Sequence, residues 1–173
     1  MKDFIETNNI DTRKALETVL YVLGRGCNNM YNVLKVIYFA DKKRISLVGT
    51  TMYKEEYRAL PAGAVPCFAY SLFQAVRSGN YTELPIVTDD ATSNMFTALR
   101  KENSKVLSKI DRRCLDEAIA EYGSLPFKEL KQIAHEQEDY KSVPLNNWIS
   151  HDLMRASLDK EGYIKEYIDS VIG

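Results

Sequence analysis

The chain has 173 residues, of which 45% are hydrophobic and 27% are charged. This length predicts one domain that can bury a core without a disulfide or a metal, and the composition is typical of globular proteins. Because 23 Lys and Arg residues stand against 24 Asp and Glu residues, the formal charge is -1. Near-neutrality argues against a disordered charged tail and against non-specific coating of DNA.

Apolar residues at helical spacing predict a first helix over Thr12–Leu23 and a second from about Met30 to Val48, with Gly49 directly after it. The Thr- and Tyr-rich segment Thr50–Leu60 predicts a short strand. A turn follows, and Pro66 then stands at the start of a helix that reaches about Arg77.

The second half of the chain predicts one edge strand and several helices. The strand is expected over Leu84–Thr88. Helices are expected over Asn94–Leu107, Asp111–Tyr122, Phe127–His135, Trp148–Leu158 and Tyr163–Val171, with a polar loop before Pro144. The predicted fold class is therefore mainly α, a single compact multi-helix domain with a small β-hairpin or short β element.

The compartment is predicted from the first residues and from the cysteines. Residues 1–14 are polar and acidic and lack the apolar run of a secretory signal. The odd number and wide spacing of Cys27, Cys67 and Cys114 predict free, mostly buried thiols rather than a disulfide framework or a zinc site. We expect a cytoplasmic protein with no membrane span, no metal and no cofactor.

A carboxylate at Asp41 lies on the same helical stripe as the apolar residues Leu34, Ile37 and Ile45. A buried carboxylate needs hydrogen-bond partners, since an unpaired charge in the interior costs several kcal/mol. We expect Asp41 to accept a backbone N–H or a Tyr hydroxyl and so to fix the following turn. The alternative is that it lines a pocket for a partner.

Catalytic motifs are missing from the sequence. The two histidines, His135 and His151, do not form a metal-binding pair, and no glycine-rich phosphate loop is present. We therefore expect that the protein is not an enzyme. An enzyme that uses Asp41 and His135 remains as an alternative, and it requires the two side chains to meet in one pocket.

A basic stretch, Arg100–Arg113, precedes an acidic one. At helical spacing Lys101, Lys105 and Lys109 share one face. The candidate nucleic-acid contacts are Lys101, Lys105, Lys109, Arg112 and Arg113. They support the alternative of a transcriptional regulator resembling a helix-turn-helix protein, although Glu129 and Glu136 on the second helix would repel phosphate. This segregation of charge also suits steering of a protein partner.

The segment Lys35–Asp41, with the sequence KVIYFAD, resembles the K-[LIV]-[LIV]-Y-F-A-D helix of the Panacea domain in the SocA-like antitoxin family, which also includes phage-associated proteins. Further matches follow in the family's order at Gly49, Glu56–Leu60, Gly63–Pro66 and Tyr70. A later block also resembles the family, at Asp111, Leu115, Tyr122, Gly123, Leu130, His135 and Glu136.

This resemblance implies an antitoxin that neutralises a cognate toxin by direct protein contact, with a phage protein that binds a host factor as an alternative. Tyrosine is favoured at interfaces, and the chain has 11 Tyr against 1 Trp. The candidate partner-binding residues are Tyr38, Asp41, Tyr53, Tyr57, Tyr70 and His135. For Tyr38 and Tyr70 the alternative is a place in the core with a hydrogen-bonded hydroxyl. The candidate structural residues are Gly49, Gly63, Val65 and Pro66.

The resemblance also implies the domain organisation. We expect one Panacea-like domain over residues 1–173, with its motifs at about 30–141. Helices within 147–172 would pack on that part.

Overall fold

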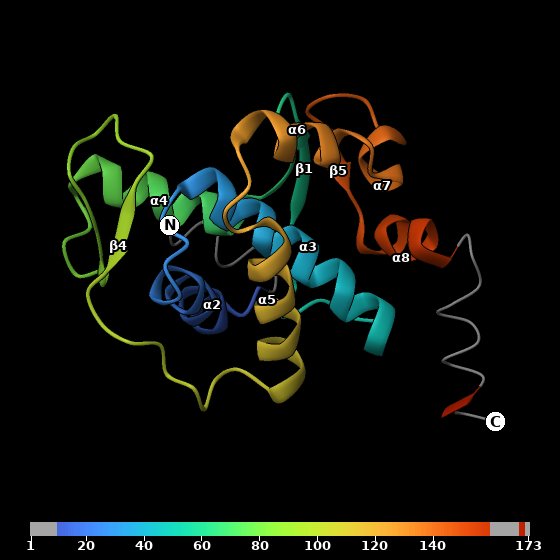
Figure 1. Ribbon diagram of the computed structural model, residues 1–173, viewed down its shortest axis with the longest axis horizontal. Helices are drawn as coiled ribbons and strands as arrows, with labels where there is room; N and C mark the ends of the chain where they lie inside the picture. Colours follow the sequence, from blue (N-terminus) through green and yellow to red (C-terminus); the bar gives the residue numbers. More distant parts are fainter. Residues whose placement is uncertain (1–9, 160–169, 172–173) are drawn as a thin grey trace.

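The computed structural model describes residues 10–159 and 170–171, and its fold is mainly α with two small antiparallel sheets (Figure 1). The elements in chain order are α2 (Thr12–Gly24), α3 (Met30–Val48), β1 (Tyr57–Leu60), β2 (Gly63–Pro66), α4 (Cys67–Ser78), β3 (Ile86–Thr88), β4 (Phe96–Ala98), α5 (Lys109–Tyr122), α6 (Phe127–His135), α7 (Glu138–Lys141), β5 (Trp148–Ile149) and α8 (His151–Asp159). The predicted fold class is confirmed.

Helix α3 lies in the centre, and α2, α5, α6, α8 and β2 pack around it (Figure 1). Its ends follow from local chemistry. The Asn29 side chain accepts the Tyr31 N–H at the start, and Gly49 closes the helix in a left-handed conformation with φ 82°. The predicted bounds of α2 and α3 are confirmed to within one residue.

The larger sheet has the strand order β2-β1-β5. β1 and β2 form a hairpin in which Tyr57 lies opposite Pro66, and β5 pairs with β1 so that Trp148 lies opposite Arg58. The helix that we expected from Trp148 was placed too early. Trp148 and Ile149 are extended because they pair with β1, and α8 begins at His151.

The predicted helix over Asn94–Leu107 is wrong. Residues 86–88 and 96–98 form the hairpin of β3 and β4 instead. Phe96 is buried against Phe73 of α4, with ring centroids 4.6 Å apart, and its backbone bonds to Asn28. These contacts with residues distant in sequence outweigh the local helical pattern.

The helices after this hairpin follow the prediction more closely. α5 begins at Lys109, two residues before the expected Asp111, because Ser108 and Asp111 form a capping box. α6 has the predicted bounds, and a short helix, α7, stands where we expected only a polar loop. The last predicted helix falls almost wholly outside the described residues.

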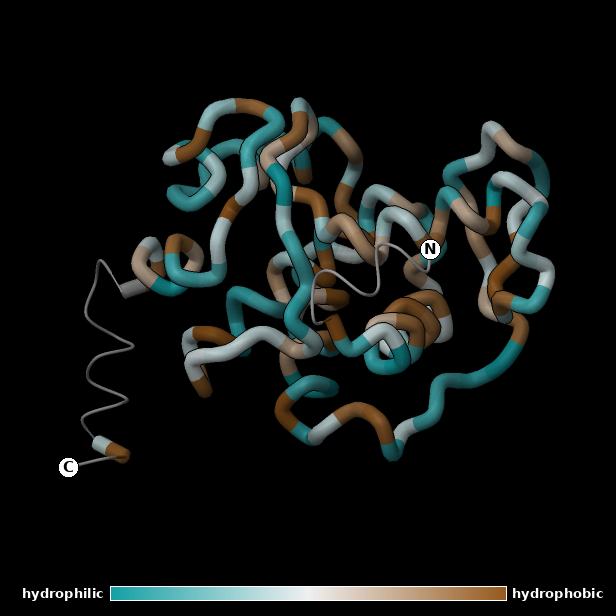
Figure 2. The backbone as a smooth tube through the Cα atoms, turned by 180° about the vertical axis from the view of Figure 1, so that it is seen from behind, coloured by the Kyte–Doolittle hydropathy of each residue, from teal (hydrophilic) through white to brown (hydrophobic). Residues whose placement is uncertain are grey.

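The core runs through α2, α3, α4 and α5. The second half of α2 is largely hydrophobic, whereas the loop between β4 and α5 is mostly hydrophilic (Figure 2). All three cysteines are free; Cys27 and Cys114 are buried and Cys67 is half-buried. None of the helices in the described part of the chain combines the length and apolar character of a bilayer span.

Candidate functional site

Helix α3 carries polar side chains into the protein interior. Lys35, Tyr38, Asp41 and Lys42 are all buried, and each must find its partners there, because an unpaired polar group in the core is destabilising. Their partners come from four other segments of the chain. The resulting polar network occupies the positions of the best sequence motifs.

Asp41 joins α3 to the segment that leads into β1. One carboxylate oxygen accepts the Met52 N–H at 2.7 Å, and the other accepts the Tyr57 hydroxyl at 2.6 Å. Complete burial raises the pKa of Asp41 to about 6, although both hydrogen bonds act in the opposite direction. The expectation that Asp41 accepts a backbone N–H or a Tyr hydroxyl is confirmed, since it accepts both.

Glu55 is a second buried carboxylate, and the sequence analysis missed it. Its oxygens accept the N–H groups of Phe68 and Ala69 at 2.9 and 3.1 Å. These donors lie in the first turn of α4, whose N-cap residue, Pro66, has no side-chain acceptor. The Tyr53 hydroxyl also donates to Glu55, at 2.8 Å. Burial raises the pKa of Glu55 to about 7. The sequence offered one signal for this role: the predicted helix after Pro66 has no capping side chain of its own, so its first N–H groups need an acceptor from elsewhere.

Lys35 is fully buried beneath the β1–β2 turn. Its ammonium donates to the Ala64 carbonyl at 2.6 Å and lies 5.1 Å from the centre of the Tyr31 ring. Burial lowers the pKa of Lys35 to about 7. The family motif thus begins with a lysine that holds the hairpin on α3 from inside.

Asp139 connects α7 to α3. Its carboxylate accepts the Tyr38 hydroxyl at 2.5 Å and the Lys42 ammonium at 3.2 Å, and Lys42 also donates to Gln137 at 2.8 Å. Burial lowers the pKa of Lys42, and the charge of Asp139 acts against that shift. These hydrogen bonds hold the segment after α6 against α3.

A further buried carboxylate, Asp111, lies at the start of α5. It accepts Lys14 of α2 and Arg44 of α3, each at 2.7 Å, and the Ser108 N–H at 2.8 Å. These contacts hold the pKa of Asp111 below its usual value despite burial. One side chain therefore ties three helices together.

A family model described as "Antitoxin SocA-like, Panacea domain" matches residues 33–140. The chain belongs to this family. No curated protein and no solved structure matches it. The match starts in α3 and ends in α7, so the Panacea region contains Lys35, Asp41, Glu55, Asp111 and Asp139.

The predicted partner-binding residues of the Panacea domain separate into two groups. Tyr38, Asp41, Tyr53 and Tyr57 are buried and form the polar interior, with the Tyr38 and Tyr57 rings 5.5 Å apart. In this conformation they offer no surface to a partner, because hydroxyl and carboxylate groups all point to internal partners. Here they shape the scaffold, and their assignment as partner contacts stays a prediction.

The two remaining candidates, Tyr70 and His135, reach the surface. Tyr70 on α4 is 37% exposed. The His135 Nε2 lies 2.6 Å from the Pro61 carbonyl oxygen, and its ring stacks on Tyr140. Among the described residues no hydrogen bond joins His135 to Asp41, whose partners are Met52 and Tyr57. In the structure these two side chains therefore have separate partners, and the catalytic alternative stays a prediction.

The predicted structural residues of the Panacea domain lie where backbone geometry is demanding. Gly63 has φ 114°, and a Cβ atom on it would lie 2.8 Å from the Ala134 Cβ and 3.0 Å from the Lys35 Nζ. Gly49 ends α3, Val65 is a buried residue of β2 and Pro66 precedes α4. Together they set the path from α3 through the hairpin into α4.

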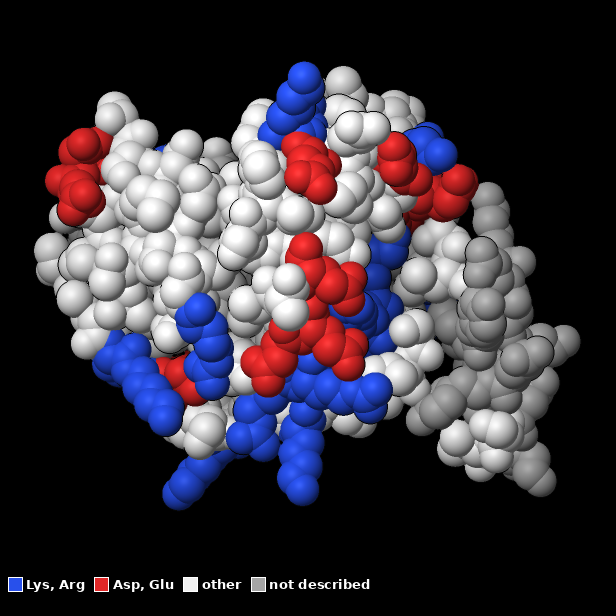
Figure 3. All heavy atoms as spheres, in the orientation of Figure 1, with Lys and Arg blue, Asp and Glu red and all other residues white. Residues whose placement is uncertain are grey.

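The prediction that the lysines of the basic stretch Arg100–Arg113 share one helical face is wrong. Lys101 and Lys105 lie in the loop before α5, Lys109 is the first residue of α5, and Arg112 and Arg113 follow in that helix. Arg113 pairs with Glu117 at 3.1 Å. Figure 3 shows acidic side chains next to the lysines and arginines at the lower edge of the molecule. This mixed surface gives no specific support to the nucleic-acid alternative.

An exposed aromatic residue marks the outer side of the larger sheet. Trp148 of β5 is 49% exposed and covers the guanidinium of Arg58, which lies 4.4 Å from the ring centre. The Arg58 Nε is buried and has no hydrogen-bond partner within the described residues. Trp and Arg are the residue types that contribute most often to binding energy at protein interfaces.

The protein also has a cavity of about 840 Å³ next to the loop between α3 and β1. Its lining includes Lys14, Arg44, His151 and Arg155, with Met52 and Tyr53. Arg44 already donates to Asp111, Thr50 and Thr51. Within the described residues no cluster of His, Cys, Asp and Glu is arranged to hold a metal ion.

Proposed function

We propose that this Panacea protein is an antitoxin that neutralises a cognate toxin by direct protein contact and is not itself an enzyme. The family match over residues 33–140 is the observation that carries the proposal. The free thiols Cys27, Cys67 and Cys114 support action in a reducing compartment, and we place the interaction in the cytoplasm.

The polar interior supports a scaffold role for the family motifs. Asp41, Glu55 and Lys35 direct their polar groups to backbone atoms of the hairpin region, so they hold its shape. A toxin would then meet side chains displayed on the outside of this shape. Variation of those outer residues can change the toxin without changing the scaffold.

The outer side of β1 and β5 is the surface that we assign to the toxin. It combines the exposed Trp148 ring with the Arg58 guanidinium that lies against this ring. Burial of a large aromatic ring next to a cation stabilises interfaces strongly. Tyr70, on the helix that follows β2, is also exposed and remains a candidate contact in its own right.

Co-expression with the toxic product of the neighbouring gene tests the proposal. We expect the wild-type protein to restore growth and to co-purify with that product. Trp148→Ala is expected to weaken binding by about thirtyfold, the equivalent of a hot-spot loss of about 2 kcal/mol. Arg58→Ala should have an effect in the same direction.

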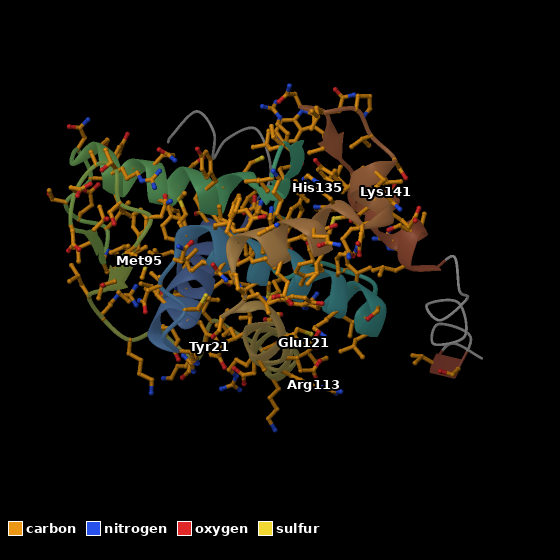
Figure 4. The ribbon with its side chains drawn as sticks, turned by 45° about the horizontal axis from the view of Figure 1, so that its top comes forward. Tyr21, Met95, Arg113, Glu121, His135 and Lys141 are labelled. Carbon is orange, nitrogen blue, oxygen red and sulfur yellow. The ribbon has the colours of Figure 1, made fainter. Side chains whose placement is uncertain are left out.

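The matched control is Arg113→Ala. Arg113 is an exposed arginine on α5, at the end of the molecule opposite His135 and Lys141 (Figure 4). This variant should neutralise the toxin as the wild type does. The antitoxin proposal would be refuted if the wild-type protein neither restored growth nor co-purified with the toxic product. If it captured a host protein instead, the result would favour a host-factor inhibitor.

A further inference from the structure

The hairpin of β3 and β4 presents an apolar outer face. It lies at one end of the molecule, to the left of α3 in Figure 1. Its inner face buries Ile86 and Phe96 against the helices. Its outer face carries Val87, Met95 and Leu99, whose side chains are 42%, 50% and 61% exposed. These three side chains share one face because residues directly opposite in an antiparallel pair, and every second residue along a strand, point to the same side.

One edge of this hairpin has free backbone groups. The Leu99 N–H donates to the Pro85 carbonyl at 2.8 Å, and this bond fixes the alternation of the ladder, so that Ile86 and Thr88 direct their N–H and C=O groups away from β4. The Phe96 N–H, which donates to Asn28 at 2.9 Å on the far side of β4, agrees with this alternation. Among the described residues no hydrogen bond reaches the backbone groups of Ile86 and Thr88 on the β3 side.

The free edge of β3 opens onto a hollow of about 190 Å³. All three residues of β3 line it, together with Val76, Gly79, Tyr81, Thr82 and Leu84. The lining is largely apolar and includes the end of α4. A side chain that projects from an added strand would therefore find an apolar receptor beside the unpaired backbone groups.

Acidic residues flank β3 at both ends. Glu83 lies before the strand, and Asp89 and Asp90 follow it; all three are exposed. Hydrogen bonds from Thr92 and Ser93 hold the pKa of Asp90 below its usual value. Figure 3 shows acidic side chains at the upper left corner of the molecule and an uncharged area below them.

Three cations lie near the hairpin. Arg77 of α4 donates to the Ser93 carbonyl at 2.8 Å and to Asn94 in the turn between β3 and β4. The other two, Arg100 and Lys101, follow β4, and Arg100 is held by Glu17 at 2.7 Å. The β3 side is therefore acidic at both ends and apolar in its middle.

We propose that the free edge of β3 binds an extended segment of a partner protein, with small apolar residues in its centre and Lys or Arg at both ends. The added strand would hydrogen-bond to Ile86 and Thr88 and place side chains into the hollow. Its terminal cations would face Glu83, Asp89 and Asp90. This surface is separate from the one at Trp148, and the proposal stands whether or not a toxin binds there.

A second copy of the chain fits this edge poorly. Antiparallel pairing of two β3 strands about Val87 would bring Asp89 and Asp90 of one copy near Glu83 of the other. Like charges across a strand pair are destabilising. The charge pattern thus favours a basic partner segment over self-association.

Fluorescence polarisation with a labelled peptide tests the proposal on the full chain. The probe is Lys-Arg-Val-Thr-Val-Thr-Arg-Lys, and its matched control is Glu-Asp-Val-Thr-Val-Thr-Asp-Glu. We expect the basic peptide to bind about tenfold or more tightly than the acidic one, a difference of about 1.4 kcal/mol. Binding should also slow hydrogen exchange at the Ile86 and Thr88 amides.

Two pairs of variants locate the contact. Thr88→Pro removes an outward N–H without removing a bond to β4, whereas Thr88→Val keeps that N–H. We expect about tenfold weaker binding for the first and wild-type binding for the second. The double change Glu83→Lys and Asp89→Lys should abolish the preference for the basic peptide, and Glu129→Lys on α6 should leave it unchanged.

The proposal would be overturned if the two peptides bound with equal affinity. It would also be overturned if binding were undiminished both in Thr88→Pro and in the double variant with Glu83→Lys and Asp89→Lys. So would a concentration-dependent dimer of the wild-type chain that Val87→Lys dissociates, because the edge would then be occupied by a second copy.

Discussion

The Lys35 ammonium lies in the space that Gly63 leaves open by having no side chain. Gly63 belongs to the β1–β2 hairpin and Lys35 to α3, and the ammonium bonds to the carbonyl of the next hairpin residue, Ala64. The glycine of the turn motif and the lysine of the helix motif therefore depend on each other. The hairpin can lie this close to Lys35 because residue 63 has no Cβ, and Lys35 in turn bonds to the hairpin backbone.

Gly63→Ala is expected to destabilise the protein by about 3 kcal/mol, from the left-handed backbone together with the close contact to Lys35 and Ala134. Gly79→Ala is the matched control, since Gly79 also has positive φ, 73°, but nothing lies within 4 Å of its added Cβ. It should lose only about 1 kcal/mol. Urea denaturation measures both, and equal losses would contradict the close-contact argument.

Asp41→Ala is expected to lower the free energy of unfolding by about 2–4 kcal/mol, because it leaves the Met52 N–H and the Tyr57 hydroxyl buried and unpaired. Tyr57→Phe removes one of these bonds and should cost about 1–2 kcal/mol. The two changes together should cost less than the sum of the single losses, since they share one interaction. A double-mutant cycle in urea checks this, and strict additivity would argue against the bond.

The local sequence pattern was sufficient to predict the bounds of the long central helices. The apolar spacing of α3, the Asn29 cap and Gly49 predicted its bounds, and an Asp on its apolar stripe predicted a hydrogen-bonded carboxylate. The partners of Asp41 could not be named from the sequence. They come from the loop after α3 and from the start of β1, whose paths depend on the whole domain.

Contacts between distant segments explain what the sequence analysis missed. Residues 94–107 have a helical pattern, yet Phe96 is drawn into the core by Phe73 and bonded by Asn28. Glu55 was missed because it caps a helix that begins twelve residues later, at Cys67. The sequence could not decide which tyrosines are buried, since Tyr suits an interface and a polar core equally well. Of the two for which a core position was also considered, Tyr38 is buried and Tyr70 is 37% exposed.

Two acidic residues on α5 should differ greatly in their effect on stability. Asp111→Asn weakens buried contacts with Lys14 and Arg44, and we expect a loss of about 2–3 kcal/mol. Glu117→Gln removes an exposed pair with Arg113 and should cost less than about 0.5 kcal/mol. Thermal unfolding of the two variants at the same ionic strength compares them, and losses of similar size would show that the Asp111 cluster is not a structural tie.

The buried titratable groups predict an unusual dependence of stability on pH. Burial raises the pKa of Asp41 to about 6 and of Glu55 to about 7, from ordinary values of 3.8 and 4.5. At a pH between the ordinary and the raised pKa of each group, the folded chain binds more protons than the unfolded chain. The stability that these two groups contribute is therefore lost as the pH rises to about 7. Burial lowers the pKa of Lys35 from 10.5 to about 7, so above pH 7 the unfolded chain binds more protons and the contribution of Lys35 to stability increases with pH.

We therefore expect the free energy of unfolding to pass through a minimum near neutral pH when urea denaturation is followed from about pH 5 to about pH 9. Below that range the stability from carboxyls with lowered pKa, such as Asp111, is lost and obscures the effect. Glu55→Gln should flatten the acidic side of the profile and Lys35→Met the alkaline side, because each removes one titrating group. Gly79→Ala, which changes no charge, should shift the whole profile without changing its shape. A maximum at pH 7 in the wild type would show that Glu55 and Lys35 are both charged in the folded protein.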